Sequence, residues 1–69
     1  MVKVFKTNVR NSRQAKLIIE KLADEFPKHK INFDLFDYDG VLRVQGASIL
    51  ERKIISIVTS LNYNCEKLQ

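Results

Sequence analysis

Hydrophobic and polar residues alternate at the start of the chain, as they do along a β-strand. The alternation places Val2 and Val4 on one face of this first strand. Lys3, Phe5 and Thr7 lie on the other face. We expect the two valines to face the core and the other three side chains to lie on the outer surface of the sheet.

A helical period follows and ends at a proline. Apolar residues recur every three or four positions, namely Ala15, Ile18, Ile19, Leu22 and Phe26. Asn11 or Ser12 is the natural N-cap, because a short polar side chain can accept from the unpaired amides of the first turn. Pro27 lacks an N–H and disfavours helical geometry at the residue before it, so the helix should stop there.

Two further alternating segments and a second helix complete the pattern. Residues 31–36 and 41–45 flank Asp39-Gly40, a sequence typical of a tight hairpin turn. Ser48 and Glu51 then match a capping box, so we expect a helix to start at Ser48. Its apolar face comprises Leu50, Ile54, Ile57, Val58 and Leu61. We expect this helix to end at Asn62, and residues 63–68 to form a short last strand.

The order strand, helix, strand, strand, helix, strand across residues 1–69 predicts one α+β domain. With right-handed crossovers it folds into a ferredoxin-like βαββαβ sandwich, with a four-stranded antiparallel sheet and both helices on one face. The composition agrees, with 45% hydrophobic residues, one proline and two glycines. No stretch is apolar enough for a membrane span, so we expect a cytoplasmic protein. Cys65 is the only cysteine, which excludes an internal disulfide.

A loop at residues 7–12 opens the first helix, and the corner Leu61-Asn62-Tyr63 precedes the last predicted strand. In these two features the sequence resembles the heavy-metal-associated family of copper chaperones and metal-ATPase N-terminal domains, which has a Leu-Gly-Tyr-like corner before its last strand. The family's metal site is a Cys-x-x-Cys in the first loop, where thiolates bind a soft cation. Residues 7–13 contain no cysteine and carry two arginines. The resemblance therefore implies the scaffold without classical metal transfer, and we expect no metal ligand and no cofactor.

The first loop is nevertheless a candidate site for an anion. The first amides of a helix are unpaired donors beside a positive dipole, and the two arginines add charge. The candidate residues are Thr7, Asn8, Arg10, Asn11, Ser12 and Arg13. A phosphate, a carboxylate or an acidic side chain of a partner protein fits this chemistry. The alternative is a solvated loop in which Asn11 or Ser12 simply caps the helix.

A second candidate surface is the outer face of the sheet, on which we expect Phe5, Phe36 and Arg43. Exposed aromatic residues suit a homodimer interface, and RNA-recognition domains stack bases on such residues. Those domains carry a third strand rich in glycine and aromatic residues, which Val41-Leu42-Arg43-Val44-Gln45 is not. This difference argues against nucleic acid.

No pairing of a nucleophile with a base, and no pair of carboxylates in unlike environments, can be recognised in the sequence. We therefore expect a non-catalytic interaction or regulatory module that binds a protein partner or an anion. One alternative is a chaperone-like protein that handles metal through unusual ligands, with Cys65 supplying sulfur. A second alternative is weak binding of nucleic acid through the outer sheet face.

Overall fold

The structure is a computed structural model that describes residues 1–36 and 40–68. Its elements are β1 (Val2–Thr7), α1 (Ser12–Glu25), β2 (Lys30–Asp34), β3 (Gly40–Gln45), α2 (Glu51–Ser60) and β4 (Cys65–Lys67). The predicted order of strands and helices is confirmed. The hairpin turn predicted at Asp39-Gly40 falls partly outside the described residues, and Gly40 is the first residue of β3.

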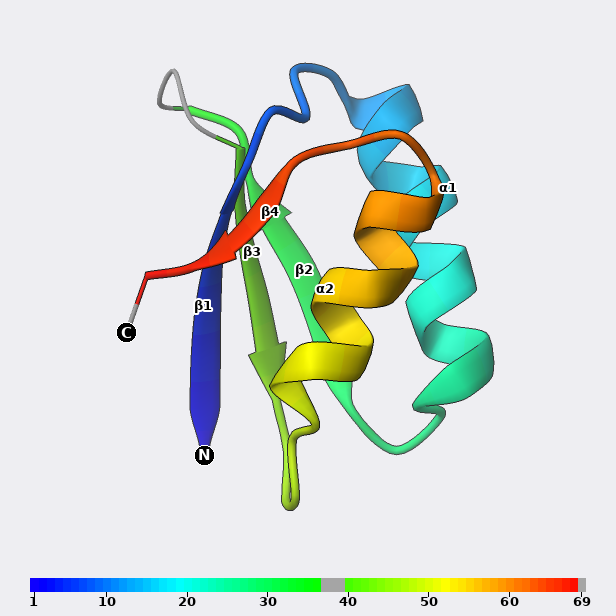
Figure 1. Cartoon of the computed structure of the whole chain (residues 1–69), viewed down its shortest axis with the longest axis vertical. Helices are drawn as coiled ribbons and strands as arrows, with labels where there is room; N and C mark the ends of the chain where they lie inside the picture. The colour runs from blue at the N-terminus through cyan, green and yellow to red at the C-terminus, as the bar shows by residue number, and fades with distance from the viewer. Residues whose placement is uncertain (37–39, 69) are drawn as a thin grey trace.

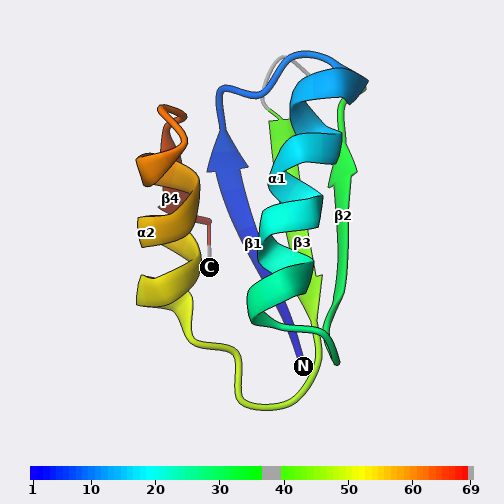
Figure 2. The ribbon, with the colours of Figure 1, turned by 90° about the vertical axis from the view of Figure 1, so that its right-hand side faces the viewer.

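The strands form one sheet in the order β2-β3-β1-β4, with every neighbouring pair antiparallel. Both helices cover one face of this sheet, with α2 beside β4 and α1 beside β2 (Figures 1 and 2). This arrangement is the predicted ferredoxin-like fold. The core lies between the sheet and the helices, and its buried residues are Phe5, Val9, Ala15, Ile18, Leu22, Phe26, Leu42, Val44, Ile54 and Val58.

The face of β1 that packs against the core is the opposite of the one predicted. Phe5 is 0% exposed, whereas Val2 is 52% exposed. Phe5 lies opposite Leu42 of β3, and Leu42 lies opposite Phe33 of β2, so these three side chains share the face that packs on the helices. The prediction was wrong because β1 has apolar residues on both faces, and the larger phenylalanine side chain buries more apolar surface than a valine.

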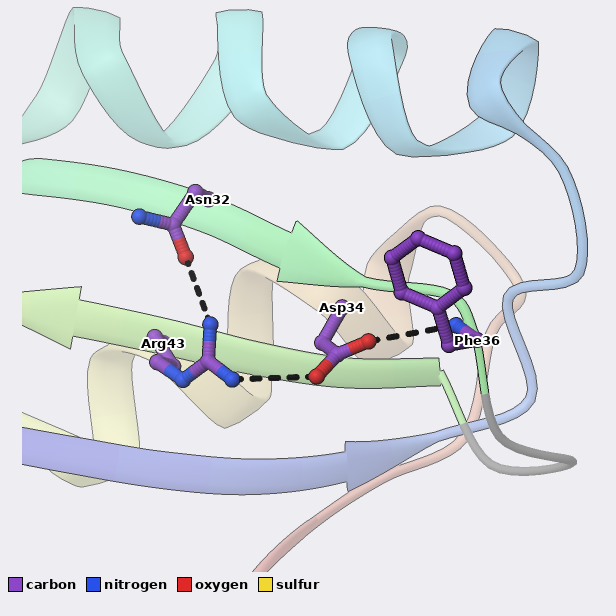
Figure 3. A network of polar contacts seen from close by, with 4 residues as sticks. All are labelled: Asn32, Asp34, Phe36 and Arg43. Carbon is purple, nitrogen blue, oxygen red and sulfur yellow. Dashed lines mark hydrogen bonds and ion pairs between the residues drawn. The ribbon is translucent and has the colours of Figure 1, made fainter.

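The outer face of the sheet carries a small polar network (Figure 3). Arg43 lies between two residues of β2, with Nη2 at 3.1 Å from Asp34 Oδ2 and Nη1 at 3.4 Å from Asn32 Oδ1. The predicted position of Arg43 on this face is confirmed. Phe36 is 99% exposed but follows the end of β2, where its N–H donates to Asp34 Oδ1. The predicted strand therefore ends before Phe36: Asp34 still pairs with Val41, but the Phe36 N–H is taken by the Asp34 side chain in a local turn.

The capping box predicted at Ser48 is absent. α2 begins at Glu51, its N-cap is Leu50, and Ser48 has a φ of 55°. The Glu51 carboxylate instead lies 3.1 Å from the ammonium groups of both Lys3 and Lys67, which project from β1 and β4 toward the helices. The hydrogen bond with Lys3, followed in size by the one with Lys67, holds the pKa of Glu51 below its ordinary value. The sequence pattern missed this arrangement because both lysines are remote in sequence from Glu51.

Asn62 ends α2 as predicted. It adopts a φ of 72°, and its N–H donates to Thr59 O at 2.9 Å. The N–H of Tyr63 reaches Val58 O at 3.4 Å, which completes a Schellman motif. Asparagine is one of the few residues that tolerate this left-handed conformation, and the turn directs the chain into β4.

Candidate functional site

A pocket of about 540 Å³ lies between the loop from β1 to α1 and the segment that enters β4. The pairing of β1 with β4 creates it, because Thr7 at the end of β1 lies opposite Cys65 at the start of β4. The two loops that continue from these residues lie beside each other at one end of the sheet (Figure 1). The lining residues are Lys6, Thr7, Asn8, Arg10, Thr59, Tyr63, Asn64, Cys65 and Glu66.

Thr7 holds the base of the loop together. Its hydroxyl donates to Gly40 O at 2.6 Å and accepts from the Val9 N–H at 3.2 Å, and the residue is only 3% exposed. Both contacts are internal, so the hydroxyl stabilises the path of the loop. Thr7 therefore shapes the pocket, and the expectation that its hydroxyl serves as a ligand for an anion is not supported.

Asn8 connects the two sides of the pocket. Its side-chain Oδ1 accepts from the Asn64 N–H at 2.8 Å, across 56 residues of sequence. This hydrogen bond fixes the first loop against the segment that leads into β4. Asn8 therefore holds the two walls of the pocket together, and its predicted role in binding an anion stays a prediction.

Arg10 contributes charge to the pocket. The residue is exposed, and its N–H donates to Gln14 Oε1 at 2.9 Å, which fixes the backbone from which the guanidinium extends. Lys6 and Glu66 also line the pocket. With two cationic residues and one acidic residue, the lining has an excess of one positive charge.

The remaining three residues of the predicted loop lie outside the pocket lining. Asn11 is the N-cap of α1, and its Oδ1 accepts from the Gln14 N–H at 2.9 Å. Ser12 and Arg13 are exposed in the first turn of α1. The capping role expected of Asn11 is therefore confirmed, and the part of the loop that borders the pocket is Thr7, Asn8 and Arg10.

The opposite wall of the pocket was not predicted from the sequence as part of this site. It consists of Thr59, Tyr63, Asn64, Cys65 and Glu66. These residues form no local motif with the first loop. The pairing of β1 with β4 brings Cys65 and Glu66 to it, and the Asn8–Asn64 hydrogen bond holds Asn64 there. Thr59 comes from α2. The available signal was the corner at residues 61–63, which places the start of β4 near the end of β1 once the strand order is known.

Cys65 is half-buried in this wall, and burial raises the pKa of its thiol to about 11. The thiolate is both the nucleophile and the metal-binding form of cysteine. The pocket therefore disfavours the reactive form of this side chain. Cys65 therefore behaves in this wall as a small, partly buried apolar side chain.

Iodoacetamide should alkylate the folded protein slowly at about pH 8, because the thiolate fraction falls about tenfold for each unit of pKa. Against the ordinary value of 9.0, we expect a rate about 100-fold below that of the urea-unfolded chain.

Since the folded pKa is raised, stability should be unaffected below about pH 9 and should fall as the pH rises toward 11. Alkylation that is equally fast in the folded and unfolded chain would contradict this assignment.

In residues 1–36 and 40–68, no three His, Cys, Asp or Glu side chains gather where they could hold a metal ion. No helix in the same part of the chain has the length and apolar character required to cross a bilayer.

The strand order and the placement of both helices on one face define a ferredoxin-like fold. The candidate site is the pocket beside β4. No protein-family model, curated protein or solved structure matches this chain significantly.

Proposed function

We propose that this chain is a non-catalytic binding module whose pocket between the first loop and β4 takes an anionic group. The anion is a phosphate or a carboxylate, including an acidic side chain of a partner protein. The observation that carries the proposal is the position of Arg10 at a pocket lined otherwise by hydroxyl, amide and charged side chains and by the Cys65 thiol.

The chemistry of the lining suits an oxyanion. A guanidinium offers several N–H donors in one plane, and its hydrogen bonds to a carboxylate or phosphate are charge-assisted. Thr59, Tyr63 and Asn64 supply hydroxyl and amide donors from the opposite wall. Glu66 carries the opposing charge and disfavours an anion on its own side of the pocket. We expect weak, salt-sensitive binding, because the site is open to water.

The proposed scaffold is that of a heavy-metal-associated domain without its cysteine pair. Two features support the proposal: the pocket borders the loop between β1 and α1, and Asn62 takes a positive φ at the position of the family's glycine. Arg10 lies in the segment where the family carries its metal ligands. A cation-binding loop would thus have become an anion-binding one.

Metal handling through Cys65 is the second candidate, because this thiol lines the same pocket as the first loop. The raised pKa of Cys65 weighs against it, since a metal must displace the thiol proton. Titration of the reduced protein with Cu(I) or Zn(II) separates the two proposals. Stoichiometric shifts of the amides of residues 7–13 would favour metal.

Binding of nucleic acid through the outer sheet face has less support than either. Phe5 lies in the core, and Arg43 is paired with Asp34. The expected pair of stacking aromatics is therefore not available on that face.

The anion proposal predicts different effects for two neighbouring arginines. Arg10→Ser should weaken binding of inorganic phosphate or of a glutamate-rich peptide about fivefold, which corresponds to about 1 kcal/mol for one exposed charge. Arg13→Ser removes the same charge from a residue that does not line the pocket, and should change the affinity less than about twofold. Chemical-shift titrations at two salt concentrations measure both.

Equal weakening by the two substitutions would indicate attraction to the overall positive charge and would contradict a specific site. Unchanged binding in Arg10→Ser would remove the pocket from consideration. Both variants lie on the exposed surface, so folding should be preserved, and circular dichroism serves as the check.

A further inference from the structure

The strand β2 forms the outer edge of the sheet on the side away from β4. It pairs with β3 only, and Figure 2 shows no other ribbon beyond it. An edge strand presents a row of unpaired N–H and C=O groups that can pair with another strand. Among the described residues, nothing pairs with this edge.

The sequence of β2, Lys30-Ile31-Asn32-Phe33-Asp34, is self-complementary about its central residue. In an antiparallel pair of two copies with Asn32 opposite Asn32, Lys30 of one chain lies opposite Asp34 of the other. In the same register Ile31 lies opposite Phe33. Directly opposed residues in antiparallel strands approach within about 4.5–5.5 Å, and opposite charges or apolar groups stabilise such pairs.

The environment of these side chains suits the pairing. Ile31 and Phe33 face the helices and are only partly buried at the rim of the core, so a second strand would cover them. Lys30 is exposed and forms no ion pair with any described residue. Asp34 already contacts Arg43, as Figure 3 shows, and an incoming lysine would place this carboxylate between two cations.

We propose that the β2 edge is an interface between two copies of this chain, related by a two-fold axis beside Asn32. An isologous contact of this kind requires a surface that is complementary to itself, which this charge and apolar pattern provides. The two sheets become one continuous sheet. The pocket borders β4 at the opposite edge, so the dimer leaves it open and the two proposals stand or fall independently.

The expected dimer is weak. Two five-residue edges bury much less than the roughly 1,200 Å² of a typical stable interface, so we expect dimers only at high protein concentration. Sedimentation velocity from about 10 μM to about 1 mM covers weak association of this kind. The mass should rise from monomer to dimer, and a monomer at the highest concentration would overturn the proposal.

Two charge reversals test the register. Lys30→Glu and Asp34→Lys each place like charges opposite each other at both ends of the pair, so each variant alone should dimerise at least about tenfold more weakly. An equimolar mixture restores an opposite-charge pair at both ends and should dimerise as well as the wild type. Lys28→Glu makes the same charge change just outside β2 and serves as the control.

Asp34→Lys also loses its contact with Arg43, which could affect folding. The mixture controls for this effect, because a variant that had lost its fold would not dimerise in the mixture either. Failure of the mixed variants to dimerise, while each is folded, would overturn the register. Hydrogen exchange of the wild type gives an independent readout. Raising the protein concentration should protect alternate amides of β2, since every second residue directs its N–H outward. Protection confined to β4 would place the interface at the wrong edge for this proposal.

Discussion

Phe5→Ser is expected to remove most of the free energy of unfolding of the protein. Phe5 is fully buried between the sheet and the helices, opposite Leu42. Truncating a buried phenylalanine costs about 3–5 kcal/mol, and placing a hydroxyl in the cavity adds to that cost. A domain of 69 residues has a total stability of roughly 3–10 kcal/mol. The substitution therefore removes most of the margin.

Urea denaturation followed by circular dichroism measures the effect. Val2→Ser is the control, because Val2 lies on the outer face of the same strand and is 52% exposed. We expect this control to cost less than about 1 kcal/mol. A Phe5→Ser protein that lost no more stability than Val2→Ser would contradict the buried position of Phe5. The sequence placed Phe5 in a possible homodimer interface on the outer face. Because a Phe5 variant that stopped self-associating would have lost its fold, such a variant cannot locate an interface.

Gly40→Ala should destabilise the protein by about 2–4 kcal/mol and should also alter the pocket. Gly40 is buried at the start of β3, where a Cβ would lie 2.8 Å from Thr7 Oγ1 and closer still to the carbonyl oxygen of Val9. The carbonyl is backbone, so the loop from β1 to α1 must move to relieve the contact. Thr7 also loses its hydrogen-bond geometry to Gly40 O.

The destabilisation is read from urea unfolding, and the displacement of the loop from the amide shifts of Asn8 and Arg10. Val41→Ala, at the next residue and on the outer face, is the matched control and should cost about 1 kcal/mol or less. A Gly40→Ala protein within about 0.5 kcal/mol of the wild type, with unchanged loop shifts, would contradict the close approach of these two segments.

The parts of this fold that the sequence predicts are those determined by local interactions. Asn11 caps α1 through a residue three positions away, and Asn62 ends α2 through a turn of neighbouring residues. Periodicity likewise indicates the helices and strands and their order along the chain. Each of these signals lies within one segment of the chain, so no knowledge of the tertiary structure is needed to recognise it.

The features that the sequence did not predict depend on contacts between distant segments. Apolar residues lie on both faces of β1, so the alternation alone does not show which face packs against the core. Glu51 was assigned to a capping box but is held by Lys3 and Lys67 from two strands. The pocket likewise needs β4 beside β1, and only that pairing distinguishes Arg10, which lines it, from Arg13, which does not.

The most direct test of the proposed binding function is a map of amide shifts during titration of the ¹⁵N-labelled protein with a glutamate-rich peptide. We expect saturable shifts at Asn8, Arg10, Asn64 and Cys65, which border the pocket on both sides. The first turn of α1 around Arg13 should change little. Shifts that followed the exposed cationic residues of α1 and left Asn64 and Cys65 unmoved would contradict binding in the pocket.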